Sequence, residues 1–458
     1  MSRGAVLGCL LVGSLWPSRA GHAQSVERRV LSLAEAEAMA LASSPMLEVA
    51  DRELELSRAK RDQASHARFL PKFELRNIWG PIPRQRGEFT STGVLVSPDT
   101  STGFSDLRFF TQVDLDITQP IWTSGKIGGL IEAADRGVEA AEANVRKERS
   151  DIRLQVRKAY WGLVLGYEME DVIRDAREQA EEARVKLEER FDEGSDQVTQ
   201  NDMFKFEIFT YDLNKRARDV ADRIELARAA LKAVVGLDGS EEVDVDTRVL
   251  EPVDAELADL TTYTAMALES RAELGQLEAG IGALSALVRV HRSDYAPHLF
   301  AGVQVKYNRA PSRFDPRNPF WNNRTNFFRP GLAVGFNWNL NFSQTRDRVN
   351  VARRDEARLA SQRRPLRNGI TLKVREAYLE TIRAKANLAD SRKARRASEN
   401  WLRAELQTFD LGIGDIKDVI DAFKANSTMR VEHLRNIFEY NTALAELSQA
   451  VGRDLYGD

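Results

Sequence analysis

The sequence predicts a mainly α-helical protein with a small β part that crosses a membrane, built from a duplicated helix-strand-strand-helix unit. Three observations support this prediction: short segments recur in the same order in both halves, two very long stretches have the spacing of packed charged helices, and four segments alternate polar and apolar residues. The chain has 458 residues, far more than one core of ordinary size needs. An elongated, repetitive architecture fits this length better than a compact domain.

The internal repeat consists of five matching pairs of segments. The pairs are 39–43 with 266–270, 69–71 with 295–297, 156–160 with 374–378, 191–194 with 409–412, and 235–238 with 451–454. Their order is kept and their spacing drifts only slightly, so chance similarity between unrelated helices is a poor explanation. We therefore expect a first repeat at 24–239, a linker at 240–261 that wraps the helices as a partly ordered belt, and a second repeat at 262–458.

Residues 1–23 have the features of a secretory signal peptide. Arg3 is followed by an apolar run from Ala5 to Trp16 and then by a small-x-small cleavage pattern. The run is too short to cross a bilayer, and no later segment reaches about 18 continuous apolar residues. The single cysteine, Cys9, lies in this segment, so the expected mature chain has no thiol for a disulfide, a metal site or a nucleophile. A lipid anchor at Cys9 is a competing interpretation, which the short apolar stretch before it disfavours.

The helices of each unit are expected to form a long hairpin. An opening helix is predicted at about 33–68, and a long helix at about 126–190 has apolar residues at alternating three- and four-residue steps. At 1.5 Å per residue, roughly 65 residues give a rod of about 100 Å. The second copy repeats the long helix at about 345–409, where Pro365 should kink or break it. Tight glycine-containing turns then lead into return helices at about 198–235 and 416–451.

Four segments between the helices have the two-residue period of β-strands, at about 72–80, 109–119, 298–307 and 331–342. Alternation over about ten residues suits a transmembrane strand, because one face meets lipid and the other a watery interior. A half-buried strand of an ordinary sheet shows the same period, but the long Gly-, Pro- and polar-rich loops between these strands favour external barrel loops. Four strands cannot close a barrel, and hydrocarbon does not tolerate an open edge. The sequence therefore predicts an assembly of more than one chain.

Composition and motifs disfavour nucleic-acid binding and enzymatic activity. The net charge is −3 with 29% charged residues, which is a balanced composition without a basic surface for nucleic acid. The histidines lack metal-ligand spacing, and the chain has no glycine-rich phosphate loop or nucleophile elbow. We therefore expect no catalytic residue, no cofactor and no metal site.

Two motifs connect the duplicated unit to a known family. The segment Gln-Pro-Ile-Trp-Thr-Ser-Gly at 119–125 leads from a strand to the first long helix, and Val-Arg-x-Ala-Tyr occurs at 156–160 and 374–378. With the signal peptide and the repeat, the mature chain resembles the TolC-like outer-membrane efflux proteins over essentially its whole length. The resemblance implies a homotrimer with a twelve-stranded β-barrel in the lipid of the Gram-negative outer membrane and a coiled-coil helical tunnel in the periplasm.

The resemblance also implies a passive exit duct. It would work with a periplasmic adaptor protein and with an inner-membrane RND-type pump or an ABC exporter of type I secretion, and it would export drugs, toxic compounds or proteins. The alternative class is a periplasmic coiled-coil adaptor or scaffold protein. Adaptors usually carry one hairpin set between β-rich domains, whereas this chain has a duplicated unit with strand pairs in its middle.

The segment 412–422 resembles the periplasmic turn of the second repeat in this family, where two acidic residues three positions apart ring the tunnel entrance and select for cations. By position, these residues are Asp418 and Asp421. Residues i and i+3 share one helix face, and threefold symmetry would multiply them into two stacked carboxylate rings. The alternative interpretation is a solvated helix start, where acidic residues stabilise the N-terminal dipole.

The resemblance also marks a candidate gate region. Phe409 falls where the family often has a gate tyrosine, so the ring is kept and the hydroxyl is lost. Gln200 and Gly414 fall where a well-known member has charged gate residues, which argues against that kind of charged lock. The candidate gate residues are Phe409, Asp415, Lys417, Gln200 and Asp202, with Asp196 as a further polar residue at the first turn.

Overall fold

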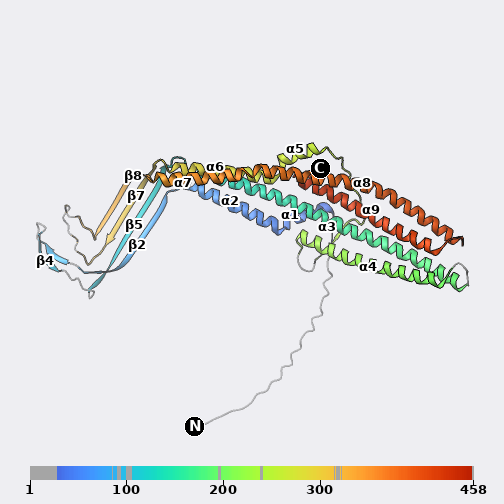
Figure 1. Ribbon diagram of the computed structural model, residues 1–458. Coiled ribbons are helices and arrows are strands. Elements are labelled where there is room, and N and C mark those ends of the chain that lie inside the picture. Colours follow the sequence, from blue (N-terminus) through green and yellow to red (C-terminus); the bar gives the residue numbers. More distant parts are fainter. Residues whose placement is uncertain are drawn as a thin grey trace, which may run out of the picture.

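The computed structural model describes residues 28–455 except 85, 90–93, 100–105, 194–197, 238–240, 314, 316–319 and 321. The expected signal peptide at 1–23, the turn at 194–195 and Asp196 lie outside the described residues. A sheet occupies one end of the molecule, and a long rod of helices extends from it (Figure 1). The predicted fold class, mainly helical with a small β part, is confirmed.

The elements of the two copies follow one another in the same order. The first copy contains α1 (Leu33–Ser43), α2 (Pro45–Phe69), β2 (Lys72–Pro83), β5 (Leu107–Trp122), α3 (Lys126–Asp192) and α4 (Gln200–Val235). The second contains α5 (Leu260–Ser270), α6 (Ala272–Ser293), β7 (His298–Arg309), β8 (Phe327–Asn337), α7 (Phe342–Ala360), α8 (Arg363–Asp410) and α9 (Ile416–Val451). A short hairpin of β3 (Arg86–Phe89) and β4 (Leu95–Asp99) lies between β2 and β5.

The opening helix expected at 33–68 is divided into α1 and α2, so the prediction of one continuous helix was wrong. Ser44 is extended, with φ −65° and ψ 122°, because the residue before a proline avoids the helical region. Pro45 then starts α2, where its missing N–H leaves no helical bond unmade. The equivalent residue of the second copy, Arg271, has almost the same conformation without a following proline (φ −63°, ψ 123°). The bend therefore belongs to the repeated unit and not only to Pro45.

The second long helix is interrupted, as expected from Pro365, but the break comes slightly earlier. α7 ends at Ala360 and α8 begins at Arg363, so Pro365 lies in the first turn of α8. A proline is tolerated there because the first N–H groups of a helix have no partner within it. The unbroken α3, with 67 residues, runs from the sheet to the far tip.

The four main strands form one antiparallel sheet in the order β2-β5-β7-β8. The fourth strand was expected at 331–342 but spans Phe327–Asn337. Its C-terminal end is shorter than expected because the chain turns there toward α7: Trp338 Nε1 donates to the carbonyl of Tyr295 at 3.1 Å. Within the described part of the chain, β2 and β8 have no strand on their outer sides.

The helices continue the sheet as a wall one helix thick. Near the sheet, α3 packs between α2 and α6, and α6 packs against α7; toward the tip, α3 packs between α4 and α9, and α9 packs against α8. The wall therefore has two free edges that extend those of the sheet. We call them the α2/α4 edge, on the side of β2, and the α7/α8 edge, on the side of β8 (Figure 1).

A belt crosses the middle of the rod, and the sequence predicted only the linker part of it. β1 (Arg28–Leu31) pairs in parallel with β6 (Glu242–Val245) of the linker. The Tyr167 hydroxyl donates to Asp244 Oδ1 at 2.6 Å, and Tyr160 donates to Asp246, so two tyrosines of α3 hold the belt. Burial raises the pKa of Tyr167, and the bond to Asp244 raises it further. Both phenols are therefore fixed as neutral donors.

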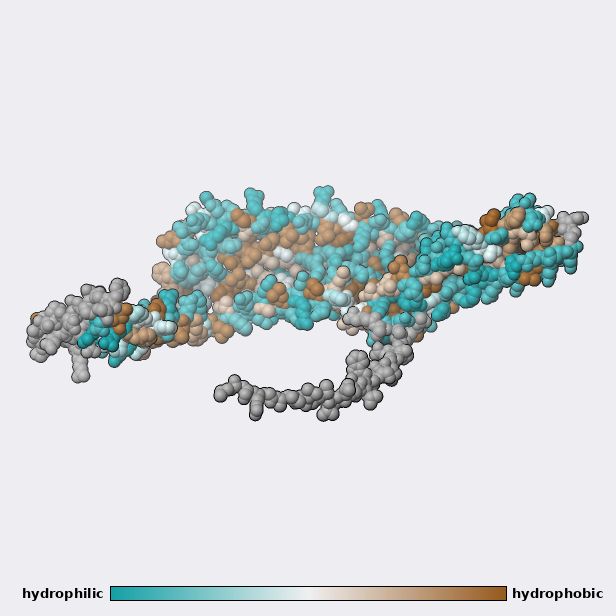
Figure 2. Space-filling view, turned by 90° about the horizontal axis from the view of Figure 1, so that it is seen from below, coloured by the Kyte–Doolittle hydropathy of each residue, from teal (hydrophilic) through white to brown (hydrophobic). Residues whose placement is uncertain are grey.

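The isolated chain exposes an unusually large surface. Its accessible area is 29506 Å², whereas a compact protein of this length would expose about 17,000 Å². Hydrophobic residues run along the helical rod between hydrophilic ones (Figure 2). No helix in the described ranges combines the length and the apolar character needed to cross a bilayer.

Candidate functional site at the helical tip

The tip of the rod is held together by one apolar cluster from four helices. The cluster contains Leu187 of α3, Phe206 and Phe209 of α4, Leu402 and Phe409 of α8, and Ile416, Val419, Ile420 and Phe423 of α9. The rings of Phe209 and Phe423 lie 6.1 Å apart, which is within the range of favourable aromatic pairs. The α8–α9 turn is therefore fixed against α3 and α4 by packing.

The start of α9 is fixed by its cap and by two glycines. The Asp415 carboxylate accepts from the Lys417 N–H at 2.8 Å, so Asp415 is the N-cap. Gly412 has a φ of +77°, the left-handed conformation that commonly ends a helix. A Cβ on Gly414 would lie 2.8 Å from the backbone N of Phe409. Glycine at 414 is thus explained by close backbone approach.

Substituting Gly414 with alanine is expected to loosen this turn. The new methyl would meet backbone rather than a flexible side chain, at a cost of about 1–3 kcal/mol. Faster proteolysis and faster amide exchange at the tip would report the effect. Gly369→Ala in α8 is the matched control, because a Cβ added there would meet no neighbouring atom within 4 Å, and replacing a mid-helix glycine should stabilise by about 0.5–1 kcal/mol. Equal protection of the tip in both variants would contradict this account.

Asp418 and Asp421 lie together on the exposed side of α9, away from the apolar cluster. Their separation of three residues places both carboxylates on one face. Neither side chain makes a hydrogen bond or an ion pair within the described part of the chain. The arrangement leaves two carboxylates per chain free to act on solutes at the tip.

The first hairpin contributes a different arrangement. Asp202 is buried and accepts from the Thr199 N–H at 3.0 Å, the Thr199 hydroxyl at 2.6 Å and Lys205 Nζ at 2.9 Å. Burial alone would raise the pKa of Asp202, but these bonds outweigh it and hold the pKa below its usual value. The hydrogen bond to Asp202 raises the pKa of Lys205, and the charge of Asp415 adds to this effect. Asp202 is thus a satisfied capping residue, while Gln200 lies exposed in the first turn of α4.

Phe409 is a packing residue in this chain. Its ring is 3% exposed and lies under the Arg190 guanidinium, whose carbon is 4.3 Å from the ring centroid. Next to it, Lys186 Nζ and Asp410 Oδ1 form an ion pair at 2.9 Å. These contacts tie the end of α3 to the end of α8. The sequence did not reveal Lys186 and Arg190, because their partners Asp410 and Phe409 lie on another helix. It did not reveal Lys205 either, because no motif marks its ion pair with Asp202.

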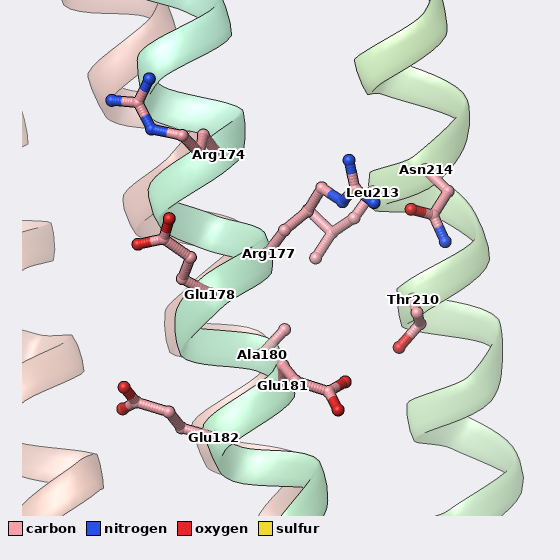
Figure 3. A pocket seen from close by; sticks show the side chains of 9 residues that line it. All are labelled: Arg174, Arg177, Glu178, Ala180, Glu181, Glu182, Thr210, Leu213 and Asn214. Atoms are coloured by element: carbon pink, nitrogen blue, oxygen red, sulfur yellow. The ribbon is translucent and has the colours of Figure 1, made fainter.

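A groove of about 750 Å³ lies between α3 and α4 in the same half of the rod (Figure 3). Arg177 and Glu181 reach toward α4, whereas Arg174, Glu178 and Glu182 point away from it (Figure 3). Charges of both signs therefore line the groove. The described residues contain no cluster of three or more His, Cys, Asp or Glu side chains placed to hold a metal ion.

Comparisons with known proteins found a partial match to one family model and a shared fold with several solved channels. Residues 38–236 match the family model described as outer membrane efflux protein. No curated protein matches the chain. The fold is similar to that of the Campylobacter jejuni CmeC outer membrane channel (TM-score 0.73, 16% identity, 93% of this chain and 86% of that chain). It is also similar to the open state of the Neisseria gonorrhoeae MtrE outer membrane channel (TM-score 0.72, 16% identity, 95% of this chain and 94% of that chain). A third similar structure is the Vibrio cholerae outer membrane protein VceC (TM-score 0.70, 16% identity, 92% of this chain and 96% of that chain).

The identities of 16% show a shared fold, and the family model adds a similarity in sequence over residues 38–236. This family consists of outer-membrane channels and not of enzymes. The channel is therefore favoured over the periplasmic adaptor or scaffold. The chain therefore resembles the outer membrane efflux proteins: residues 38–236 match their family model, and its fold is that of outer-membrane channels over nearly the whole chain.

Proposed function

We propose that three copies of this chain form a passive exit duct, with a twelve-stranded barrel in the outer membrane and a helical tunnel in the periplasm. The observation that carries the proposal is the pair of free edges. The sheet ends in β2 on one side and in β8 on the other. The helical wall ends in the α2/α4 edge on the side of β2 and in the α7/α8 edge on the side of β8. An open sheet edge is not stable in hydrocarbon. Pairing β8 of one copy with β2 of the next would satisfy every edge and close a ring.

Both helical edges present apolar side chains at helical spacing, as an interface requires. On the α2/α4 edge these are Met46, Val49 and Leu56 of α2 and Phe204, Ile208 and Tyr211 of α4; on the α7/α8 edge they are Leu372, Leu379, Ile382 and Trp401 of α8. Ile208 is 71% exposed and Trp401 is 44% exposed in the single chain. Each lies about two turns from the tip. Contact between the two edges of neighbouring copies would bury both.

Charge also differs between the edges near the middle of the rod. The first turns of α2 carry Glu48, Asp51, Glu53 and Glu55, with Arg52 as the cation among them. Around the α7–α8 break, Arg353, Arg354, Arg364 and Arg367 are exposed and have no carboxylate partner within the described part of the chain. Opposite charge on the two edges favours a head-to-tail ring over pairing of like edges. At least eight strands are needed for a membrane barrel, and the family resemblance supports three copies.

Placing a charge in the apolar stripe of either edge is expected to prevent assembly. Ile208→Glu and Trp401→Glu would each bury a carboxylate against an apolar partner, at a cost of several kcal/mol. The mass of the purified protein in detergent, and its migration on unheated denaturing gels, would shift from trimer to monomer. Ile413→Glu is the control, because Ile413 is 77% exposed but lies on the α8–α9 turn rather than on an edge. Trimers that survive both edge substitutions would overturn the proposal.

The proposed duct receives cargo through its partners. We place the contact with a periplasmic adaptor, and through it with an RND-type pump or an ABC exporter, at the tip. The support is an exposed apolar pair there, Leu411 and Ile413, together with the mixed-charge groove between α3 and α4. Ile413→Glu should therefore keep the trimer and reduce export in cells. Asp418 and Asp421 would lie at the same end and select for cations, rather than only stabilise the start of α9.

A further inference from the structure

The two faces of the four-stranded sheet differ sharply in chemistry. One face carries Phe73, Leu75 and Trp79 of β2, Val113, Leu115 and Ile117 of β5, Val303 and Val305 of β7, and Leu332, Val334 and Phe336 of β8. The residues between them in the sequence point to the opposite face, because side chains alternate along a strand. In a closed barrel the apolar face meets lipid, so the opposite face lines the interior.

The strand register orders the charges of this inner face into two transverse rows. Arg76 lies opposite Asp114, Asp114 opposite Lys306, and Lys306 opposite Arg329. This row contains three cations and one carboxylate, and we call it the cationic row. The neighbouring row, two residues closer to the helices, has Glu74 opposite Asp116, Asp116 opposite Gln304, and Gln304 opposite Gly331. This acidic row contains two carboxylates and no cation.

The charges of the cationic row are largely free to act on solutes. The side chains of Arg76 and Lys306 are exposed and make no hydrogen bond or ion pair within the described part of the chain. Arg329 donates to Asn322 and, at 2.9 Å, to the carbonyl of Asn323, which fixes its position without neutralising it. Asp114 accepts from Gln112 Nε2 at 2.8 Å, a neutral donor.

The acidic row keeps a net negative charge. Asp116 accepts from Gln304 Nε2 at 2.5 Å, which is again a neutral donor. Glu74 pairs with Lys72, but this pair lies on the exposed start of β2, where an ion pair is weak and water competes. Two residues along a strand span about 7 Å, which is less than the screening length of about 8 Å at physiological salt. Each row therefore has its own local potential on the scale of a small solute.

We propose that the barrel contains a charge-selective step of its own, in which the cationic row of Arg76, Lys306 and Arg329 attracts anionic groups after they have passed the acidic row. This inference rests on the proposed closure of the sheet into a barrel, which would repeat each row around the interior. A solute leaving the cell meets negative charge at Glu74 and Asp116 and then positive charge one step further out. Carboxylate- or phosphate-bearing solutes are the class that the outer ring favours.

The absence of cysteine after Cys9 allows a direct test with thiol reporters. In a Cys9→Ser background, Ile78→Cys lies next to the cationic row, and Gln304→Cys lies within the acidic row. The trimer in lipid vesicles would be treated with two thiosulfonate reagents of similar size, one bearing a sulfonate and one a trimethylammonium group. The ratio of anionic to cationic reagent rates should be higher for the Ile78→Cys protein. Adding Arg76→Gln with Lys306→Gln should lower that ratio roughly threefold or more.

Two controls separate this inference from the channel itself. Arg153→Gln with Arg346→Gln removes two exposed cations from α3 and α7, outside the sheet, and should leave the ratio unchanged. In planar bilayers, the cationic-row variant should shift the reversal potential toward cations, whereas Glu74→Gln with Asp116→Asn should shift it toward anions. If the parent conducts but the substitutions in both rows leave the reagent ratio and the reversal potential unchanged, the charge-selective step alone is overturned. If the parent does not conduct, both the proposed barrel and the proposed charge-selective step are overturned.

Discussion

Replacing both Asp418 and Asp421 with alanine is expected to remove most of the cation preference of the channel and its block by divalent cations. Both carboxylates lie on the exposed side of α9 and lack a partner within the described part of the chain. In three copies they would form two rings at the narrow end of the tunnel, where the charges of neighbouring chains act on the same solute. Single-channel recordings with unequal salt on the two sides would measure the change in reversal potential.

The charge itself can be separated from the shape of the entrance. Changing both residues to asparagine keeps the size of the side chains and should lose the preference as the alanine variant does. Changing both to glutamate should keep it, since the charge remains. The start of α9 should fold normally in all three variants, because Asp415 provides the cap and the apolar cluster provides the packing. A parent-like cation preference and divalent block in the alanine variant would disprove the role of these residues.

The Arg157→Ala substitution is expected to destabilise the helical part by about 3–5 kcal/mol, because it breaks a largely buried ion cluster. Arg157 Nε donates to Glu37 Oε1 at 2.7 Å, and Nη1 and Nη2 donate to the two carboxylate oxygens of Asp454 at 3.0 and 2.6 Å. Burial opposes the charge on Arg157, yet the two carboxylates hold its pKa above the ordinary value. Removing the guanidinium would leave Glu37 and Asp454 without this cation.

Arg153 offers a matched control for this substitution. It lies one turn before Arg157 on α3, is exposed and has no partner within the described part of the chain. Arg153→Ala should change stability by no more than about 0.5 kcal/mol. Urea unfolding of the solubilised protein, followed by the helical circular dichroism signal, would compare the two variants. If both substitutions lowered the free energy of unfolding by similar amounts, the bidentate contact with Asp454 would contribute little to stability.

The periodic parts of this fold are readable in the sequence, because each repeats one local rule many times. The three- and four-residue steps of residues 126–190 predict α3, and the two-residue alternation predicts β2, β5, β7 and β8 together with their two unlike faces. The repeat also predicts that the second long helix will resemble the first. Pro365 indicated its break, although the chain leaves the helix at Ser361 and Gln362.

Other features depend on contacts between distant residues and leave no local pattern. Nothing near Arg28 indicates that this segment pairs with Glu242, and nothing near Phe409 shows that Arg190 covers its ring. Position in the family suggested Phe409 as a gate residue, whereas its surroundings are those of a core residue. The charge rows on the sheet likewise need the register, because a shift of one residue would exchange the faces.

The cluster around Arg157 has a consequence for the order in which the molecule can be completed. Its guanidinium is near the middle of α3, Glu37 is in α1, and Asp454 follows the last helix. During synthesis α1 and α3 emerge long before residue 454, so the buried cation lacks its bidentate partner until residue 454 has been made. A product shortened before Asp454 would keep a weak point around Arg157, where local opening exposes backbone to proteases. The contact thus joins the first helix of the first copy to the end of the second copy.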